Sequence, residues 1–119
     1  MALKVVIVED EPSHVLLLRY NLEQEDYAVC TISSQDPIVS YIDFIQDAHL
    51  IIVSVELDHS DGLSICTLIR DSGSSTPILF VSTSIDEVAC ACLTNLDYLS
   101  KPFSISDLMS KVRALIKEY

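Results

Sequence analysis

Five short strand-like segments alternate with segments of helical pattern, and this alternation constrains the fold more than any other feature of the chain. The first and third of them are uninterrupted runs rich in Val and Ile, which is typical of strands covered on both faces. Strands are expected at Lys4–Val8, Tyr27–Ile32, Leu50–Val55, Ile78–Val81 and Tyr98–Ser100. Helices are expected at Pro12–Gln24, Asp36–Ile45, Gly62–Arg70, Asp86–Thr94 and Ile105–Lys117. Strict alternation predicts an α/β fold of the (βα)5 type, with a parallel five-stranded sheet and helices on both faces.

Length and charge limit what this fold could do. A chain of 119 residues buries enough surface for one core, so residues 1–119 are expected to form one domain. Its 18 acidic and 7 basic residues give a net charge of -11, which would repel a phosphate backbone, so we expect no direct binding of nucleic acid. No apolar run approaches the roughly 18 residues of a membrane span. The first residues do not resemble a signal peptide, and we expect a cytoplasmic location.

The four cysteines give a weaker signal. In a cytoplasmic protein they are expected to be reduced. Cys90 and Cys92 are two positions apart, and such residues do not face each other on a helix, so a shared metal is disfavoured. A cysteine-based redox or metal sensor is kept as an alternative function.

Polar residues follow several of the expected strands. In a parallel sheet the carboxyl ends of the strands form one edge, and functional sites lie beyond it. The residues that should meet there are Glu9, Asp10, Ser54, Glu56, Ser82 and Lys101. Their ordered combination is more specific than any one of them.

The sequence resembles the receiver domain of bacterial response regulators, the CheY-like family, over Lys4 to Lys117. The residues that carry the resemblance are V-V-I-V-E-D-E-P at 5–12, L-I-I-V-S at 50–54, D-G-L at 61–63, P-I-L-F-V-S-T at 77–83 and Y-L-S-K-P-F at 98–103. The last segment and the helix after it look most like the OmpR/PhoB class, whose receivers precede a DNA-binding domain. The resemblance implies a doubly wound sheet of order 2-1-3-4-5 and a role in two-component control of transcription, through an output domain beyond residue 119.

The resemblance also implies roles for individual residues. In ordinary receivers a histidine kinase's phosphoryl group moves, with the help of magnesium, to an aspartate at the end of the third strand. Glu9 and Asp10 match the acidic pair of the family, with Asp10 as the direct metal ligand. Ser82 matches the hydroxyl that senses the phosphoryl group, and Tyr98 matches the aromatic that moves inward on activation. Lys101 matches the lysine that contacts the phosphoryl oxygens, and its bond to Pro102 would be cis.

Ser54 is the main departure, because it stands where the family has the phosphoryl-accepting aspartate. A serine hydroxyl is neutral at pH 7 and needs a positioned base to act as a nucleophile. Magnesium also loses a carboxylate, so any site formed by Glu9, Asp10 and Glu56 should be weak or vestigial, and no other cofactor is expected. We therefore expect an atypical receiver that signals without phosphorylation and is not an enzyme. The alternative is a conventional receiver that uses a displaced carboxylate, Glu56 or Asp58.

Two further features concern partners. The span from Ser82 to Lys101 is three residues shorter than in the OmpR/PhoB pattern, so the helix at Asp86–Thr94 should be shortened. Asp97, Asp107 and Lys111 match charged positions of the family's dimer face. That face would combine the Asp86–Thr94 helix, the Tyr98–Ser100 strand and the Ile105–Lys117 helix, and it predicts a homodimer.

Overall fold

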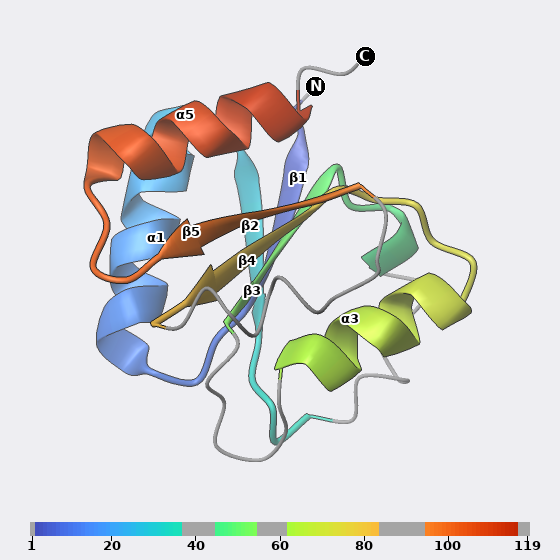
Figure 1. Ribbon diagram of the computed structural model, residues 1–119. Coiled ribbons are helices and arrows are strands. Elements are labelled where there is room, and N and C mark those ends of the chain that lie inside the picture. The colour runs from blue at the N-terminus through green and yellow to red at the C-terminus, as the bar shows by residue number, and fades with distance from the viewer. Residues whose placement is uncertain (1, 37–44, 55–61, 84–94, 117–119) are drawn as a thin grey trace.

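The computed structural model describes residues 2–36, 45–54, 62–83 and 95–116 (Figure 1). A single twisted sheet lies at its centre, with helices packed on both faces. The strands are β1 (Lys4–Val8), β2 (Ala28–Ile32), β3 (Leu50–Ser54), β4 (Ile78–Ser82) and β5 (Leu96–Ser100). The helices are α1 (Pro12–Gln24), α3 (Gly62–Asp71) and α5 (Ile105–Ile116).

All four strand pairings are parallel, and the strand order is β2-β1-β3-β4-β5. The order expected from the family resemblance is therefore confirmed. Since every strand runs in the same direction, all five carboxyl ends lie at one edge of the sheet, next to the N-terminus of α1 and the segment between β5 and α5 (Figure 1).

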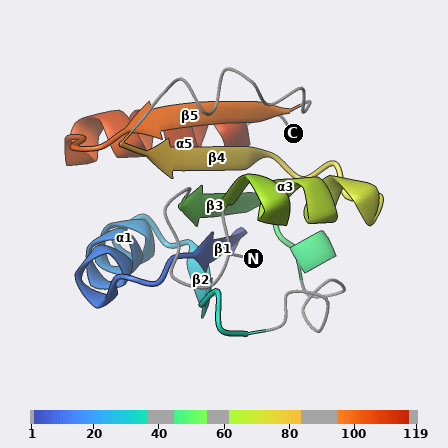
Figure 2. The ribbon, with the colours of Figure 1, turned by 60° about the horizontal axis from the view of Figure 1, so that its bottom comes forward.

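Alternation along the strands divides the core into two layers, beneath the helices that cover the two faces of the sheet (Figure 2). Alternate residues of the central strands, such as Val6, Ile51 and Phe80, pack with α3 on one face. Residues such as Val5, Ile52 and Leu79 pack with α1 and α5 on the other. Successive side chains of a strand point to opposite faces, so a strand covered on both sides must be apolar throughout. This explains why β1, β3 and β4 are continuous apolar runs.

Element bounds follow the sequence pattern closely, with β5 as the main exception. The expected strand at Tyr98–Ser100 begins two residues earlier, at Leu96. Leu99 is its one buried residue and Tyr98 is exposed, because β5 is an edge strand. The weak apolar pattern of such a strand hides its start. The helices expected at Asp36–Ile45 and Asp86–Thr94, with the shortening of the latter, fall largely outside the described residues.

The turn before β5 is held by polar contacts rather than by glycine. Asn95 has a φ of 57°, a left-handed conformation that asparagine tolerates better than most residues. Its side-chain amide donates a hydrogen bond of 2.7 Å to the carbonyl of Ser75. The guanidinium of Arg70, at the end of α3, donates to the Asn95 carbonyl at 3.1 Å, and burial lowers the pKa of that guanidinium. These contacts connect the end of α3 to the start of the edge strand.

Within the described residues, no helix combines the length and apolar character needed to cross a membrane.

Candidate functional site

Glu9 and Ser54 form the centre of the site at the carboxyl edge of the sheet. Val8 and Val53 are register partners in β1 and β3, so the next residue of each strand is also adjacent. Glu9 follows the parity of Val5 and Ile7, and Ser54 that of Leu50 and Ile52, so both point to the face covered by α1 and α5. The Ser54 hydroxyl donates a hydrogen bond of 2.5 Å to Glu9 Oε1. Both residues are buried: Ser54 is 2% exposed and Glu9 is 5% exposed.

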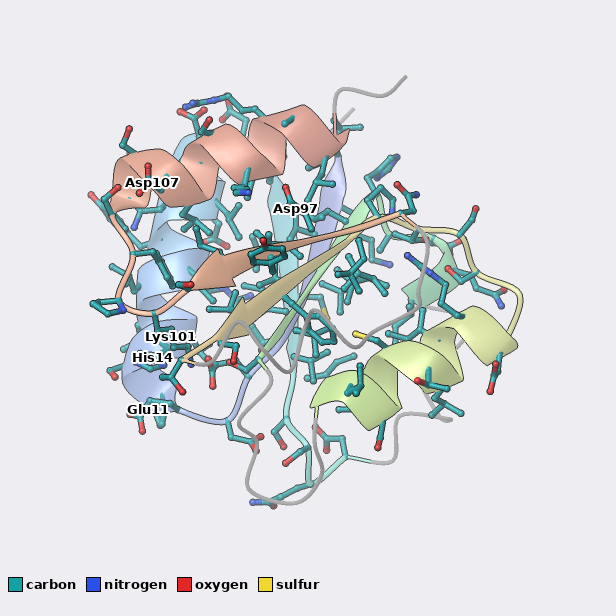
Figure 3. All side chains as sticks on the ribbon, viewed as in Figure 1. Glu11, His14, Asp97, Lys101 and Asp107 are labelled. Atoms are coloured by element: carbon teal, nitrogen blue, oxygen red, sulfur yellow. The ribbon has the colours of Figure 1, made fainter. Side chains whose placement is uncertain are left out.

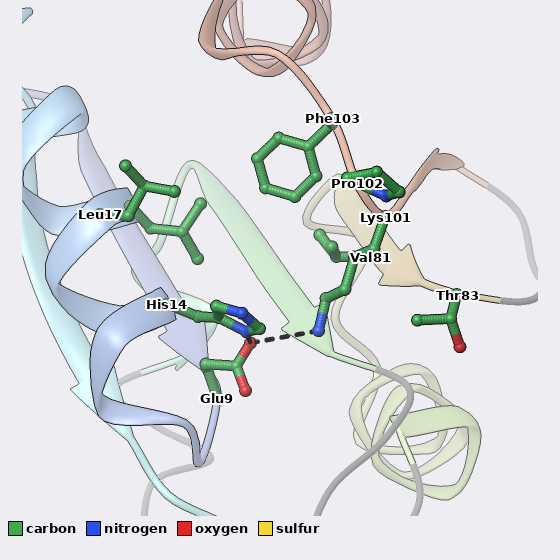
Figure 4. A pocket seen from close by; sticks show the side chains of 9 residues that line it. Glu9, His14, Leu17, Val81, Thr83, Lys101, Pro102 and Phe103 are labelled. Atoms are coloured by element: carbon green, nitrogen blue, oxygen red, sulfur yellow. Dashed lines mark ion pairs between the residues drawn. The ribbon is translucent and has the colours of Figure 1, made fainter.

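Lys101 reaches this pair from the end of β5, as the sequence predicted. Its Nζ donates to Ser54 Oγ at 3.3 Å and lies 3.7 Å from Glu9 Oε1 (Figure 4). The Lys101–Pro102 peptide bond is cis, which confirms the expectation from the resemblance. The ammonium group offsets the charge of the buried carboxylate, which would otherwise be costly to bury.

The second oxygen of Glu9 is held by the backbone. Glu9 Oε2 accepts hydrogen bonds from the N–H groups of Asp10, at 3.0 Å, and Glu11, at 3.1 Å. Both carboxylate oxygens therefore have protein partners. The Glu9, Ser54 and Lys101 side chains form a compact polar cluster, which we call the Glu9 cluster.

Asp10 is directed to a different partner from Glu9. Its Oδ1 accepts from the backbone N–H of Ser34 at 2.7 Å, and its Oδ2 from the Ser34 hydroxyl at 2.5 Å. Carboxylates are the right donors for magnesium, but the described residues hold no group of three acids, histidines or cysteines arranged around a metal position. Glu56, the third predicted ligand, lies outside the described residues. The carboxylates of Glu9 and Asp10 are chemically suitable ligands for a magnesium ion. To bind one, each would have to give up hydrogen bonds that it makes within the protein.

His14 also joins the site, although it was not among the residues predicted to meet at this edge. Its Nδ1 lies 3.5 Å from Glu9 Oε1, with no hydrogen-bond partner among the described residues. Its place in the first turn of α1, directly after the β1 strand end, was the available signal. His14 contacts the carboxylate and not the Ser54 hydroxyl. The arrangement is therefore the reverse of a serine nucleophile paired with a histidine base.

The comparison with known proteins decides the family. The model of the response regulator receiver domain matches residues 5–113. The chain belongs to the response regulator receiver domain family. Receiver domains act through partner proteins such as kinases and output domains.

Curated relatives agree with this assignment. The chain is 32% identical over 117 residues to the alkaline phosphatase synthesis transcriptional regulatory protein PhoP of Bacillus subtilis, covering 96% of this chain and 48% of that protein. It is 35% identical over 118 residues to the response regulator ArlR of Staphylococcus aureus, covering 96% and 52%. The chain spans about half the length of these relatives.

Solved structures agree with the fold. A response regulator receiver domain protein from Bacillus halodurans has a TM-score of 0.86 and 28% identity, with 97% of each chain covered. The chemotaxis protein CheY4 of Vibrio cholerae has a TM-score of 0.83 and 20% identity, with 97% of this chain and 99% of that chain covered. The similarity to CheY4 extends to the fold alone.

Two further predicted residues of this receiver are Ser82, at the end of β4, and Tyr98, in β5. Ser82 is buried at the end of β4, and its parity directs it to the face that holds Ile78 and Phe80. Its carbonyl accepts the backbone N–H of Lys101 at 2.7 Å. Tyr98 is 40% exposed and points outward from the edge strand.

The charged residues of the predicted dimer face divide into one pair and one separate acid. Lys111 Nζ lies 3.1 Å from both carboxylate oxygens of Asp97 and 5.7 Å from the centre of the Tyr98 ring. Asp107 lies in the first turn of α5, where its backbone N–H donates to the Ser104 hydroxyl at 3.0 Å. Figure 3 shows Asp97 and Asp107 on β5 and α5, apart from His14 and Lys101.

Proposed function

We propose that this chain is an atypical receiver domain, which transmits a signal through protein contacts without accepting a phosphoryl group at the Ser54 position. The observation that carries the proposal is the state of the Ser54 hydroxyl. It stands at the strand end where the family resemblance places the acceptor aspartate. There it donates to Glu9 and accepts from Lys101 while almost fully buried.

The chemistry of this contact argues against a nucleophilic serine. A serine attacks only when a base removes its proton. The group that accepts the hydrogen bond from the Ser54 hydroxyl is Glu9, a carboxylate that is a weak base and is itself surrounded by donors. Ser54 Oγ also accepts a hydrogen bond from the Lys101 ammonium group. We therefore propose no catalytic role for this site.

The output of the proposed receiver is control of transcription. The relatives at 32–35% identity are named as regulators, among them PhoP, NisR and ArlR, and they are about twice as long as this chain. We propose that the chain acts on an output domain or a separate regulator, with homodimer contacts through β5 and α5 at the Asp97–Lys111 pair. The helix expected at Asp86–Thr94, the third part of that face, lies outside the described residues.

Acetyl phosphate labelling tests the proposal. The protein is incubated with acetyl phosphate and magnesium, and its intact mass is measured, with a conventional receiver domain in parallel as the control for the reagent. We expect the conventional domain to gain one phosphoryl group and this chain to gain none. A stoichiometric adduct on this chain would overturn the proposal. The variants Glu56→Gln and Asp58→Asn would then show whether a displaced carboxylate carries the adduct.

A further inference from the structure

A cavity of about 390 Å³ opens between the first turns of α1, the end of β4 and the segment that joins β5 to α5. Figure 4 shows Leu17 on one side of it and Phe103, Pro102 and Val81 on the other, with Glu9, His14 and Lys101 at one end. We infer that this cavity binds a small, uncharged, mainly apolar molecule that presents one hydrogen-bond acceptor to Lys101. The inference is independent of the proposed function, because Ser54 does not line the cavity and its phosphorylation is not involved.

The size and walls of the cavity suit a molecule built on one ring. Binding sites for small molecules usually have volumes of roughly 300–1,000 Å³, with apolar walls and few polar groups, and this cavity lies at the lower end of that range. Leu17, Leu18, Val81, Pro102 and Phe103 form most of its lining. Leu17 is 42% exposed although its side chain is apolar, and a ligand beside it would remove part of this surface from water.

At the polar end of the cavity, the Lys101 ammonium group has more N–H donors than contacts among the described residues. An ammonium group has three N–H donors, and among the described residues Lys101 Nζ has one hydrogen bond, to Ser54, and one ion pair, to Glu9. The Lys101 side chain is 16% exposed and lines the cavity. The remaining N–H donor of Lys101 can meet one acceptor atom of a ligand.

Charge selects an uncharged acceptor over an ion. Glu9 and Lys101 carry opposite charges 3.7 Å apart, so the net charge of this end is close to zero when His14 is neutral. An anion would approach the Glu9 carboxylate within a chain of net charge -11. A cation would compete with Lys101, which is already paired with Glu9 at 3.7 Å. An amide, ketone or alcohol oxygen meets neither difficulty.

Three probes of similar size separate these cases. Benzamide, benzoate and benzylamine share the ring and differ in charge at pH 7. Each is titrated into the ¹⁵N-labelled protein, and backbone amide shifts are followed by NMR. We expect benzamide to give saturable shifts around His14, Leu17 and Phe103, with a dissociation constant of about 1 mM. The two ions should bind at least about tenfold more weakly, a difference of roughly 1.4 kcal/mol.

A matched pair of variants places the ligand. Leu17→Trp adds bulk to a lining side chain and should abolish the benzamide shifts. Leu16→Trp makes the same change one residue earlier, where the side chain is 67% exposed and outside the cavity lining, and should leave them unchanged. The inference is overturned if benzamide gives no saturable shifts, if an ion binds as tightly as benzamide, or if Leu17→Trp binds normally. The shift map of the unsubstituted protein locates the site even if Leu17→Trp does not fold.

Discussion

The Ser54 hydroxyl donates a 2.5 Å hydrogen bond to the Glu9 carboxylate, across the ends of two adjacent strands and 45 residues of sequence. With Lys101 and two backbone N–H groups, this bond surrounds a buried carboxylate with donors. Buried charges are tolerated only when they are paired and hydrogen-bonded. Ser54 is therefore a structural partner of Glu9. Substitutions of Ser54 should lower the free energy of unfolding of the domain.

Removing the Ser54 hydroxyl should destabilise the fold. In Ser54→Ala, Glu9 Oε1 loses its closest donor, and we expect the free energy of unfolding to fall by about 1–3 kcal/mol, the range for a buried charged group left short of a partner. Urea denaturation measures this change. Ser13→Ala is the control, since the Ser13 hydroxyl also contacts a carboxylate, that of Glu11, but in an exposed position. Equal, small effects in the two variants would contradict the structural role of Ser54.

Replacing Ser54 by aspartate should make stability depend on magnesium. The new carboxylate would lie next to Glu9, and Lys101 offsets only one of the two charges, so like charges repel in a buried place. Without metal, we expect the melting temperature of Ser54→Asp to fall by about 5 °C or more. Magnesium bound only by the folded variant should reverse the loss.

Thermal melts at pH 8 with EDTA and with magnesium test this expectation. Ser13→Asp is the control, because it adds the same charge at an exposed position and should neither lose stability nor respond to magnesium. A Ser54→Asp variant that melts as high as the unsubstituted protein in EDTA would refute the electrostatic argument.

The unsubstituted protein should bind magnesium weakly. Glu9 and Asp10 must give up hydrogen bonds to Ser54, Ser34 and the backbone before they can act as ligands, and magnesium favours near-ideal octahedral oxygen sites. Calorimetric titration should give a dissociation constant of about 1 mM or weaker. Binding tighter than this by tenfold or more would mean that a further carboxylate, such as Glu56, completes the site.

The proposed homodimer should depend on Lys111. Lys111→Glu places two like charges where Lys111 now pairs with Asp97, and sedimentation velocity at micromolar concentration should shift from dimer to monomer. Arg113→Glu is the control, because this substitution makes the same charge change on α5 at a residue that pairs with Glu25, at the end of α1, and not with Asp97. A protein that is monomeric before substitution, or that stays dimeric in Lys111→Glu, would exclude this face.

The sequence alone determined the elements of this domain and the edge at which its polar residues meet. Continuous Val and Ile runs identified β1 and β3, because a strand that is buried on both faces needs apolar side chains at consecutive positions. The starts of α1 and α5 are equally local, because Pro12 has a fixed φ and the Ser104 hydroxyl caps the first turn of α5. The placement of Lys101 opposite Glu9 also followed, since parallel strands bring their carboxyl ends together.

Tertiary structure decided which side chains at that edge touch one another. Glu9 and Asp10 are neighbours in sequence, yet one turns to Ser54 and the other to Ser34, because successive residues of an extended chain point in opposite directions. His14 enters the site, and Tyr98 stays outside it, through the packing of α1 and α5 on the sheet. The cavity beside Lys101 exists only where α1, β4 and the β5–α5 segment meet. Such contacts depend on strand register and helix position across tens of residues, which no local pattern of the sequence records.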